Sequence, residues 1–393
     1  MSFICLSVLI AKLIQLKPVS ENITQTASQT DVIKNDDPAD DTEQHEFLKG
    51  VWVPYMELDV SKSNDTQQAF KEKFQDIINT ALEHNINTLI VHVRSHSDAL
   101  YPSKIFPISH ILTGTQGQKQ DFDALAYMTE TAHANNLKFH AWINPLRISS
   151  LTTPTEICDS NPCKNEIFTD KLIRHRNGVI YDPAYSEVRD LVANGVREIV
   201  ENYNVDAIHF DDYFYPEIQD VISGDTSRLS ENPETQRQKN INALIKQVHE
   251  TIKSTNPNVE FGISPPGNIN KCPYMGIDVA AWLSQNYVDY ICPQIYWSLD
   301  FAECPFEKCV NDWKETISKS QSNAKFYVGL ALYKVCTDAD NGTWQNDKKI
   351  LAKELELARS NSSNGVILYS ANCFQKLKDS EELTYLDDTL KNQ

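Results

Sequence analysis

The chain has 393 residues, and its 41% of hydrophobic and 23% of charged residues are typical of a globular protein with a large core. Its net charge of −18 and the lack of a Lys/Arg cluster argue against a nucleic-acid partner bound through its phosphates. This length accommodates one large α/β domain or two domains of medium size.

Residues 3–11 form an apolar run that is too short to span a bilayer. The run resembles the apolar part of a secretory signal, although no Lys or Arg precedes it and no small-residue cleavage site follows it. We expect residues 1–17 to be a signal or apolar N-terminal segment, and the protein to be secreted or associated with the cell envelope, tethered through this segment in the second case. The alternative is an apolar end that packs on the folded domain.

Residues 18–46 are rich in Ser, Thr, Gln and Asp and contain almost no large apolar side chains. Burial of so little apolar surface cannot offset the entropy lost on ordering, so we expect a disordered polar linker. The folded domain is then residues 47–393.

Eight short runs of apolar, β-branched or aromatic residues follow along the chain. Their nearly continuous hydrophobicity is typical of strands buried on both faces, as in parallel sheets. Helical periodicity separates them, for example at Phe70, Phe74, Ile77 and Ala81. The runs are residues 50–56, 88–94, 138–144, 206–211, 259–265, 288–296, 325–332 and 365–370.

Eight alternations of strand and helix in about 340 residues predict an α/β fold, the (β/α)8 TIM barrel. A doubly wound sheet is the alternative, but it usually has fewer strands and a Gly-rich phosphate-binding turn. Neither G-x-G-x-x-G nor G-x-x-x-x-G-K-[ST] occurs. Near the C-terminus, Leu383, Leu386 and Leu390 favour a short docked helix over a free tail.

Four of the nine cysteines form two pairs that are close in the sequence. Cys158 with Cys163, and Cys304 with Cys309, each form a C-x4-C pair in a predicted loop. Such pairs favour disulfide-closed loops in an oxidising compartment. Zinc is the alternative, but C-x4-C without C-x2-C or a partnered His is a poor zinc signature.

Polar and aromatic side chains follow nearly every predicted strand. In a (β/α)8 barrel the carboxyl ends of the strands carry the functional residues. Hydroxyl or acetamido groups of a sugar suit the polar members, and sugar rings stack on the aromatic ones. The candidates for substrate binding are Arg94, His140, Asn144, Tyr213, Ser264, Gln294, Tyr296 and Trp297.

Asp211 and Asp212 end the fourth predicted strand among aromatic residues. Carboxylates there lose hydration free energy unless they do chemistry or bind a charge. Strand alternation places Asp211 on the same face as Ala207 and His209, a small and polar set that suits the barrel interior. We predict that Asp211 is the principal catalytic carboxylate, acting as general acid, and that Asp212 orients or binds the sugar. The alternative is that both acids cap the next segment.

Glycoside hydrolysis normally needs a second carboxyl group. Asp98, in the second βα loop, is the first candidate, whereas Asp182 precedes Pro and suits a helix cap. Glu57 and Asp300 are further candidates for this second carboxyl group. Arg94 is expected to bind a carboxylate of the substrate or to keep Asp211 ionised, and a structural ion pair is its equally weighted alternative.

The strand-end segments, taken in chain order, cover roughly residues 47–335. They are Gly50-Val51-Trp52-Val53, Val93-Arg94 with Asp98-Ala99-Leu100-Tyr101-Pro102-Ser103-Lys104, Leu112-Thr113-Gly114, His140-Ala141-Trp142-Ile143-Asn144-Pro145, the stretch from His209 to Pro216, Phe261-Gly262-Ile263-Ser264-Pro265, and Pro293-Gln294-Ile295-Tyr296-Trp297.

Together these segments resemble the glycosyl-hydrolase-like 10 family of bacterial cell-envelope TIM-barrel glycosidases. The resemblance implies hydrolysis of a bacterial polysaccharide, and peptidoglycan glycan strands stripped of peptide are the substrate seen among relatives. Pro266-Gly267 stands where the family usually has Phe-Gly, and the loop cysteines are also atypical.

We therefore expect a glycoside hydrolase for a cell-wall glycan that needs no cofactor and no stable protein partner. Two alternatives stay open. One is a metal-dependent hydrolase or deacetylase that uses His92, His140 and His209. The other is a barrel that binds glycans without cleaving them.

Overall fold

The computed structural model describes residues 46–222 and 234–392 of the chain. The predicted N-terminal segment and all but the last residue of the predicted linker lie outside this part. None of the helices in the described ranges has the length and apolar character needed to cross a bilayer.

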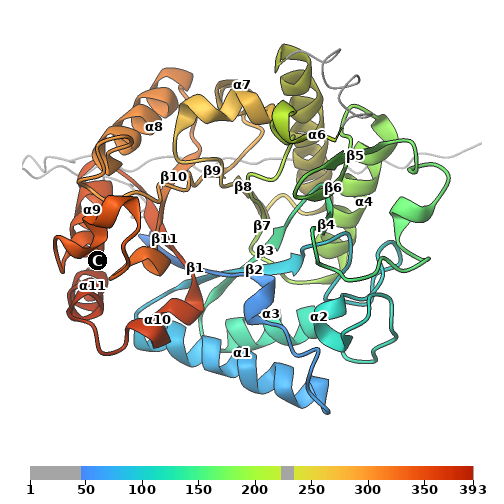
Figure 1. Cartoon of the computed structure of the whole chain (residues 1–393), viewed down its shortest axis with the longest axis horizontal. Helices are drawn as coiled ribbons and strands as arrows, with labels where there is room; N and C mark the ends of the chain where they lie inside the picture. The colour runs from blue at the N-terminus through green and yellow to red at the C-terminus, as the bar shows by residue number, and fades with distance from the viewer. Residues whose placement is uncertain (1–45, 223–233, 393) are drawn as a thin grey trace, which may run out of the picture. The chain divides into compact units, whose positions relative to one another are not determined.

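Parallel strands close into a barrel in the order β1-β11-β10-β9-β8-β7-β3-β2, at the centre of Figure 1. Each of the eight predicted runs overlaps one of these strands, so the predicted (β/α)8 barrel is confirmed. The strands are β1 (Leu48–Val53), β2 (Thr88–Arg94), β3 (Lys138–Ile143), β7 (Ala207–Phe210), β8 (Glu260–Ile263), β9 (Tyr290–Ile291), β10 (Lys325–Leu330) and β11 (Gly365–Tyr369).

Helices alternate with the strands and surround them (Figure 1). The predicted C-terminal helix is confirmed, because Leu383, Leu386 and Leu390 are buried on the last of these helices. The helices are α1 (Thr66–Glu83), α2 (His110–Thr113), α3 (Ala124–Ala134), α4 (Ser186–Asn202), α6 (Glu234–Thr255), α7 (Val279–Ser284), α8 (Phe306–Ser320), α9 (Ile350–Ser360), α10 (Ala371–Leu377) and α11 (Glu381–Lys391).

Local sequence explains why α1 forms where it does. The side chain of Asp65 caps its first turn by accepting a hydrogen bond from the backbone N of Gln68 at 3.0 Å. Phe70, Phe74 and Ile78 then recur at helical spacing and are fully buried against the barrel. Asp123 caps α3 in the same way.

The barrel separates two cores. Alternate strand residues, such as Ile208 and Phe210 of β7, pack outward into the layer between strands and helices. The other residues fill the barrel interior, including Trp52, Trp142, Ala207 and Tyr290. Because β7 is regular, the predicted alternation holds and His209 also lies inside, where it contacts Trp52 and Tyr290.

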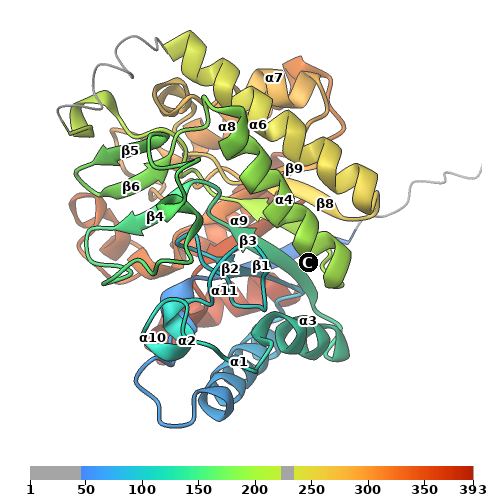
Figure 2. The same cartoon turned by 90° about the vertical axis from the view of Figure 1, so that its right-hand side faces the viewer.

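A small antiparallel sheet in the connection from β3 to α4 was not predicted. Its strands pair in the order β4-β6-β5 and lie together beside the barrel in Figure 2. They are β4 (Arg147–Ser150), β5 (Leu172–His175) and β6 (Gly178–Tyr181). Each has four residues, too few for an alternating pattern to stand out from a polar loop.

The cysteines of the described residues are all free, so the expected disulfides are not found in this part of the chain. Cys158 Sγ lies 3.3 Å from Ser160 Oγ rather than against Cys163. The Sγ atoms of Cys304 and Cys309 are 3.0 Å apart as unbonded thiols.

Candidate active site

A cavity of about 340 Å³ opens at the carboxyl ends of the barrel strands. Residues from the ends of β1, β3, β7, β8 and β11 all contribute to its walls. Its lining is Trp52, Pro54, Tyr55, Met56, His92, Trp142, Arg147, Ser150, Asp211, Asp212, Tyr213, Ser264, Gln294, Tyr296, Tyr333 and Tyr369.

Asp211 is buried in the wall of this cavity and is held as a hydrogen-bond acceptor. Its Oδ2 accepts from Trp142 Nε1 at 3.0 Å and from Asn144 Nδ2 at 3.2 Å. Its Oδ1 accepts from the backbone N of Tyr213 at 3.2 Å. Burial raises the pKa of Asp211, while the charge of Arg147 and these hydrogen bonds oppose the rise and favour the carboxylate.

Asp212 also lines the cavity, although strand alternation alone would point it outward. The reason is that β7 ends at Phe210, so regular alternation no longer applies two residues later. Burial, and next the negative charge of Asp211, raise the pKa of Asp212 to about 7. The pair therefore offers a carboxyl group that carries a proton near neutral pH beside a carboxylate that accepts hydrogen bonds.

Aromatic rings surround the two acids. Trp52 meets Tyr296 edge to face, with ring centroids 6.3 Å apart, and Tyr296 meets Tyr333 in the same way at 5.9 Å. Tyr213 is 43% exposed at the mouth of the cavity. These faces are suited to the apolar faces of sugar rings.

Two further predicted binding residues line the cavity. Ser264 Oγ lies 3.1 Å from His209 Nε2, and Gln294 Nε2 donates to the backbone O of Ser264 at 2.9 Å. Asn144 is buried behind the cavity, where its hydrogen bond to Asp211 orients that carboxylate.

The three histidines of the metal alternative do not converge on one point. His140 Nδ1 and His209 Nδ1 lie 3.0 and 2.9 Å from the hydroxyl of the same residue, Tyr290. His92 instead stacks on Trp142, with ring centroids 3.5 Å apart. Within the described ranges, no group of three or more His, Cys, Asp or Glu side chains is arranged to hold a metal ion.

His140 and Trp297 were predicted to bind substrate, but neither lines the cavity. His140 is buried deeper in the barrel against Tyr290. Trp297 packs at the edge of the outer core. Both residues therefore lie outside the lining of the cavity that holds the two acids.

Arg94 likewise does not reach the cavity, because a register shift between His92 and Arg94 interrupts β2. The shift pairs Arg94 with the outward-facing Ile143, and its guanidinium lies over the Phe106 ring at 4.4 Å. A Cβ on Gly195 of α4 would come within 2.1 Å of Arg94 Nη1, so the helix closes over it. In this position Arg94 contacts neither the cavity nor Asp211, the two places that its predicted roles require.

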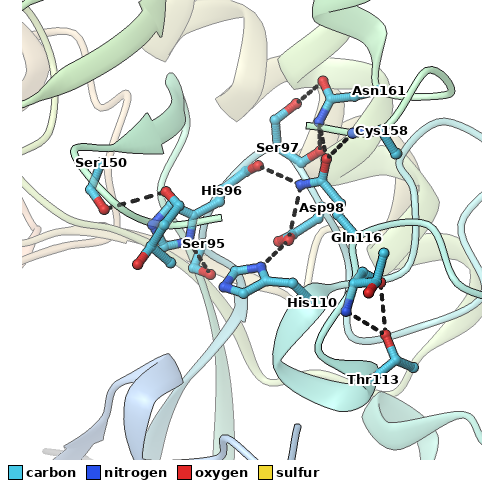
Figure 3. A network of polar contacts seen from close by, with 12 residues as sticks. Ser95, His96, Ser97, Asp98, His110, Thr113, Gln116, Ser150, Cys158 and Asn161 are labelled. Carbon is cyan, nitrogen blue, oxygen red and sulfur yellow. Dashed lines mark hydrogen bonds and ion pairs between the residues drawn. The ribbon is translucent and has the colours of Figure 1, made fainter. Parts of the chain in front are cut away.

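Asp98 is fully buried in a polar network of the second βα loop, shown in Figure 3. Its Oδ2 lies 2.9 Å from His110 Nδ1 and accepts from Gln116 Nε2 at 3.2 Å. His110 and Gln116 outweigh burial and lower the pKa of Asp98. Asp98 does not line the cavity, so the structure does not bring the predicted second carboxylate to Asp211.

The other acids left open by the sequence also lie outside the lining. Asp182 accepts from Tyr215 Oη at 3.0 Å and from the backbone N of Ala184 at 3.0 Å. Glu57 binds Ser370 Oγ and the backbone of Asn372. Asp300 is exposed.

Several lining residues were not among the predicted site residues. Trp52 and Trp142 share the inward face of their strands with Gly50 and His140, so strand alternation could have identified them. Arg147 has no such signal, because it begins the four-residue β4. Tyr55, in the 3-10 helix Tyr55–Glu57, likewise depends on how the loop folds.

A family model described as Glycosyl hydrolase-like 10 matches residues 47–346. The chain is 30% identical over 344 residues to glycosyl hydrolase YngK of Bacillus subtilis, a match that covers 79% of the chain and 66%, just under two thirds, of that protein. It is 28% identical to glycosyl hydrolase DigH of Escherichia coli, covering 89% of the chain and 88% of that protein.

Solved structures with the same fold include the PgaB (BpsB) glycoside hydrolase domain of Bordetella bronchiseptica. The TM-score is 0.60 at 10% identity, over 88% of the chain and 99% of that domain. The endo-1,4-beta-mannanase of Rhizomucor miehei gives a TM-score of 0.55 at 10% identity, over 88% of the chain and 96% of that enzyme. At such identities the likeness concerns the fold.

Proposed function

The chain belongs to the glycosyl hydrolase-like 10 family, and from this premise we propose that it cleaves peptide-free peptidoglycan glycan strands or a related N-acetylated bacterial glycan. The family and the relatives named glycosyl hydrolases support glycan hydrolysis in general. The observation that carries the proposal for this chain is the pair Asp211 and Asp212 in an aromatic-lined cavity.

The proposed chemistry divides the two acids by their surroundings. Asp212, with its pKa raised to about 7, is the general acid that protonates the glycosidic oxygen. Asp211, which accepts three hydrogen bonds, is the carboxylate that stabilises the oxocarbenium-like charge. Water then adds to the anomeric carbon, and its proton passes to the Asp212 carboxylate, which restores the acid. This assignment exchanges the roles expected from the sequence, because Asp212 rather than Asp211 is the acid held in its protonated form.

The alternatives have less support. The Nδ1 atoms of His140 and His209 both contact the Tyr290 hydroxyl, so a metal held by these two nitrogens would have to displace those contacts. A barrel that only binds glycan would gain nothing from a buried acid beside a half-buried one, because the loss of their hydration is unfavourable without a chemical role.

Export belongs to the same proposal, because a cell-wall glycan lies outside the cytoplasmic membrane. We propose that residues 1–17 direct secretion or attachment to the envelope. Cell fractionation of the full chain and of a chain that lacks these residues would test this. Equal retention of both inside the cell would contradict it.

The test of activity is the release of reducing ends from peptide-free glycan strands, with and without a chelator. We expect chelator-insensitive cleavage that Asp211→Asn lowers by about 10²-fold or more, since this substitution removes the charge that stabilises the transition state. Asp388→Asn, the same change at an exposed position of α11, is the matched control and should cleave at the wild-type rate.

Each other outcome has a defined meaning. Loss of activity with the chelator would favour the metal alternative. Binding of strands without release of reducing ends would favour the glycan-binding barrel and contradict the catalytic role of both acids.

A further inference from the structure

Arg147 is a buried cation in the wall of the cavity with an unused hydrogen-bonding group. It begins β4, and its side chain is 9% exposed. Its backbone N donates to Asn144 Oδ1 at 3.0 Å, and its Nε donates to the backbone O of Ser95 at 2.8 Å. Its Nη2 is buried and has no hydrogen-bond partner among residues 46–222 and 234–392. An unpartnered buried guanidinium nitrogen is unfavourable unless a ligand completes it.

Two tyrosine rings lie near this guanidinium. Its Cζ lies 4.7 Å from the ring centroid of Tyr213 and 5.8 Å from that of Tyr55. Both tyrosines line the same cavity. The guanidinium is therefore held at its Nε by Ser95 and lies near two aromatic rings, while its Nη2 is left for recognition of a ligand.

Neither of the two acids in the cavity forms a hydrogen bond with the Arg147 guanidinium in the part of the chain that the structure describes. Within the described residues, Arg147 also forms no ion pair with Asp211 or Asp212, which act on it only through their charge. A single cation beside two acids suits a group with one negative charge better than a doubly charged phosphate. A carboxylate matches the planar guanidinium edge by geometry as well as by charge.

We propose that Arg147 recognises a carboxylate carried by the glycan and thereby selects strands whose sugars bear a free acid. This inference rests on the proposed function. In peptidoglycan the lactyl carboxyl group of alternate sugars is amide-linked while the peptide is attached and becomes a free carboxylate when the peptide is removed. Recognition of that carboxylate by Arg147 would make the enzyme selective for peptide-free strands.

The experiment compares kcat/KM on two matched glycans. One is the peptide-free strand, and the other is the same strand with its lactyl carboxylates converted to primary amides, which keeps the size and removes the charge. We expect the wild type to prefer the acid form by at least about tenfold, and Arg147→Met to lower this ratio to about one. Arg147→Lys retains the positive charge but lacks the planar guanidinium, so its preference for the acid strand should be intermediate between those of the wild type and Arg147→Met.

A polymer of N-acetylhexosamine and uronic acid identifies the source of the carboxylate. Cleavage of this polymer with the same dependence on Arg147 would assign a ring carboxylate rather than the lactyl one. The ratio of kcat/KM on the acid and amide strands is measured on the wild type, so it tests the proposal even if a variant fails to fold.

The outcomes separate this inference from the proposed function. Equal wild-type cleavage of the acid and amide strands would overturn the role of Arg147 and leave the proposed substrate standing. Loss of rate by the same factor on both strands in Arg147→Met, with a displaced pH profile, would mean that Arg147 acts only on the two acids. Cleavage of neither strand by the wild type would contradict both proposals.

Discussion

Asp211 and Asp212 are neighbours in the chain, but their side chains lie in different surroundings. Asp211 accepts hydrogen bonds from Trp142, Asn144 and the backbone of Tyr213, which favour its ionised form. Asp212 is half-buried beside that charge, and its pKa rises to about 7. At the scale of the residue, the protein thus separates an acid from a carboxylate by environment rather than by residue type.

This separation predicts how activity depends on pH. A general acid works in its protonated form, so kcat/KM should fall as the pH rises through about 7. Asp212→Asn should lower kcat by about 10²- to 10⁴-fold, because the amide cannot donate the proton. Rates measured from pH 5 to pH 9 test both expectations. An activity that still rises above pH 8 would contradict the role of Asp212.

The charge of Asp211 is the second cause of the raised pKa, after burial. Asp211→Asn removes that charge, so the Asp212 carboxyl should titrate at a lower pH in the variant. Carbon NMR of labelled aspartate reports this titration directly, even when turnover is too slow to measure. An unchanged titration would show that burial alone sets the pKa of Asp212.

At the scale of the element, strands β8 and β9 pack closely, because Gly262 of β8 lies against the ring of Tyr290 of β9. A Cβ on Gly262 would lie 1.9 Å from Cζ of the Tyr290 ring, which is fully buried. The hydroxyl of that ring contacts both His140 and His209. Gly262 therefore makes room for the tyrosine that orders the histidines beneath the active site.

Gly262→Ala should lower the free energy of unfolding by about 3 kcal/mol or more, because the Tyr290 ring has no space to move. Urea unfolding measures the loss. Gly50→Ala is a milder control on β1, since its Cβ would meet only side-chain atoms at 2.9 to 3.1 Å. Tyr290→Leu removes the clashing ring, so its combination with Gly262→Ala should cost less than the sum of the two single changes.

At the scale of the whole molecule, two sets of buried ionisable groups oppose each other. Burial lowers the pKa of His96 and of His140 to about 3, so the folded protein keeps these rings neutral. Burial raises the pKa of Glu57 and, to about 7, that of Asp212, so their carboxyl groups take up protons more readily in the folded state. As the pH falls, the histidines reduce stability and these carboxyl groups increase it.

The contribution of one histidine can be isolated with His140→Asn. Below pH 6.5 the unfolded wild type binds a proton at His140, whereas the folded state does not do so until about pH 3. Between pH 6.5 and pH 4, the stability of the variant relative to wild type should therefore rise by about 1.4 kcal/mol for each unit of falling pH. Urea unfolding at several pH values measures this slope, and a difference that does not vary with pH would contradict it.

The barrel and the inward direction of Asp211 could be predicted because both follow from local patterns. Strands buried on both faces carry nearly continuous apolar runs, and the regular β7 keeps its alternation up to Phe210. The position of Arg94 outside the cavity could not be predicted, because β2 changes register after His92 and turns the side chain outward. Asp98 turned away from the cavity because His110 and Gln116, from the same loop, already bind it.

The sequence alone determined the class of fold, the family resemblance and the strand end that carries the two acids, since hydrophobic periodicity and short motifs are written locally in the chain. Only the tertiary structure decided which side chains meet in the cavity. It brought Arg147 and Tyr55 there from irregular segments and left Arg94 and Asp98 outside. The physical reason is that register shifts and loop closure depend on contacts between residues far apart in the chain, which no local pattern records.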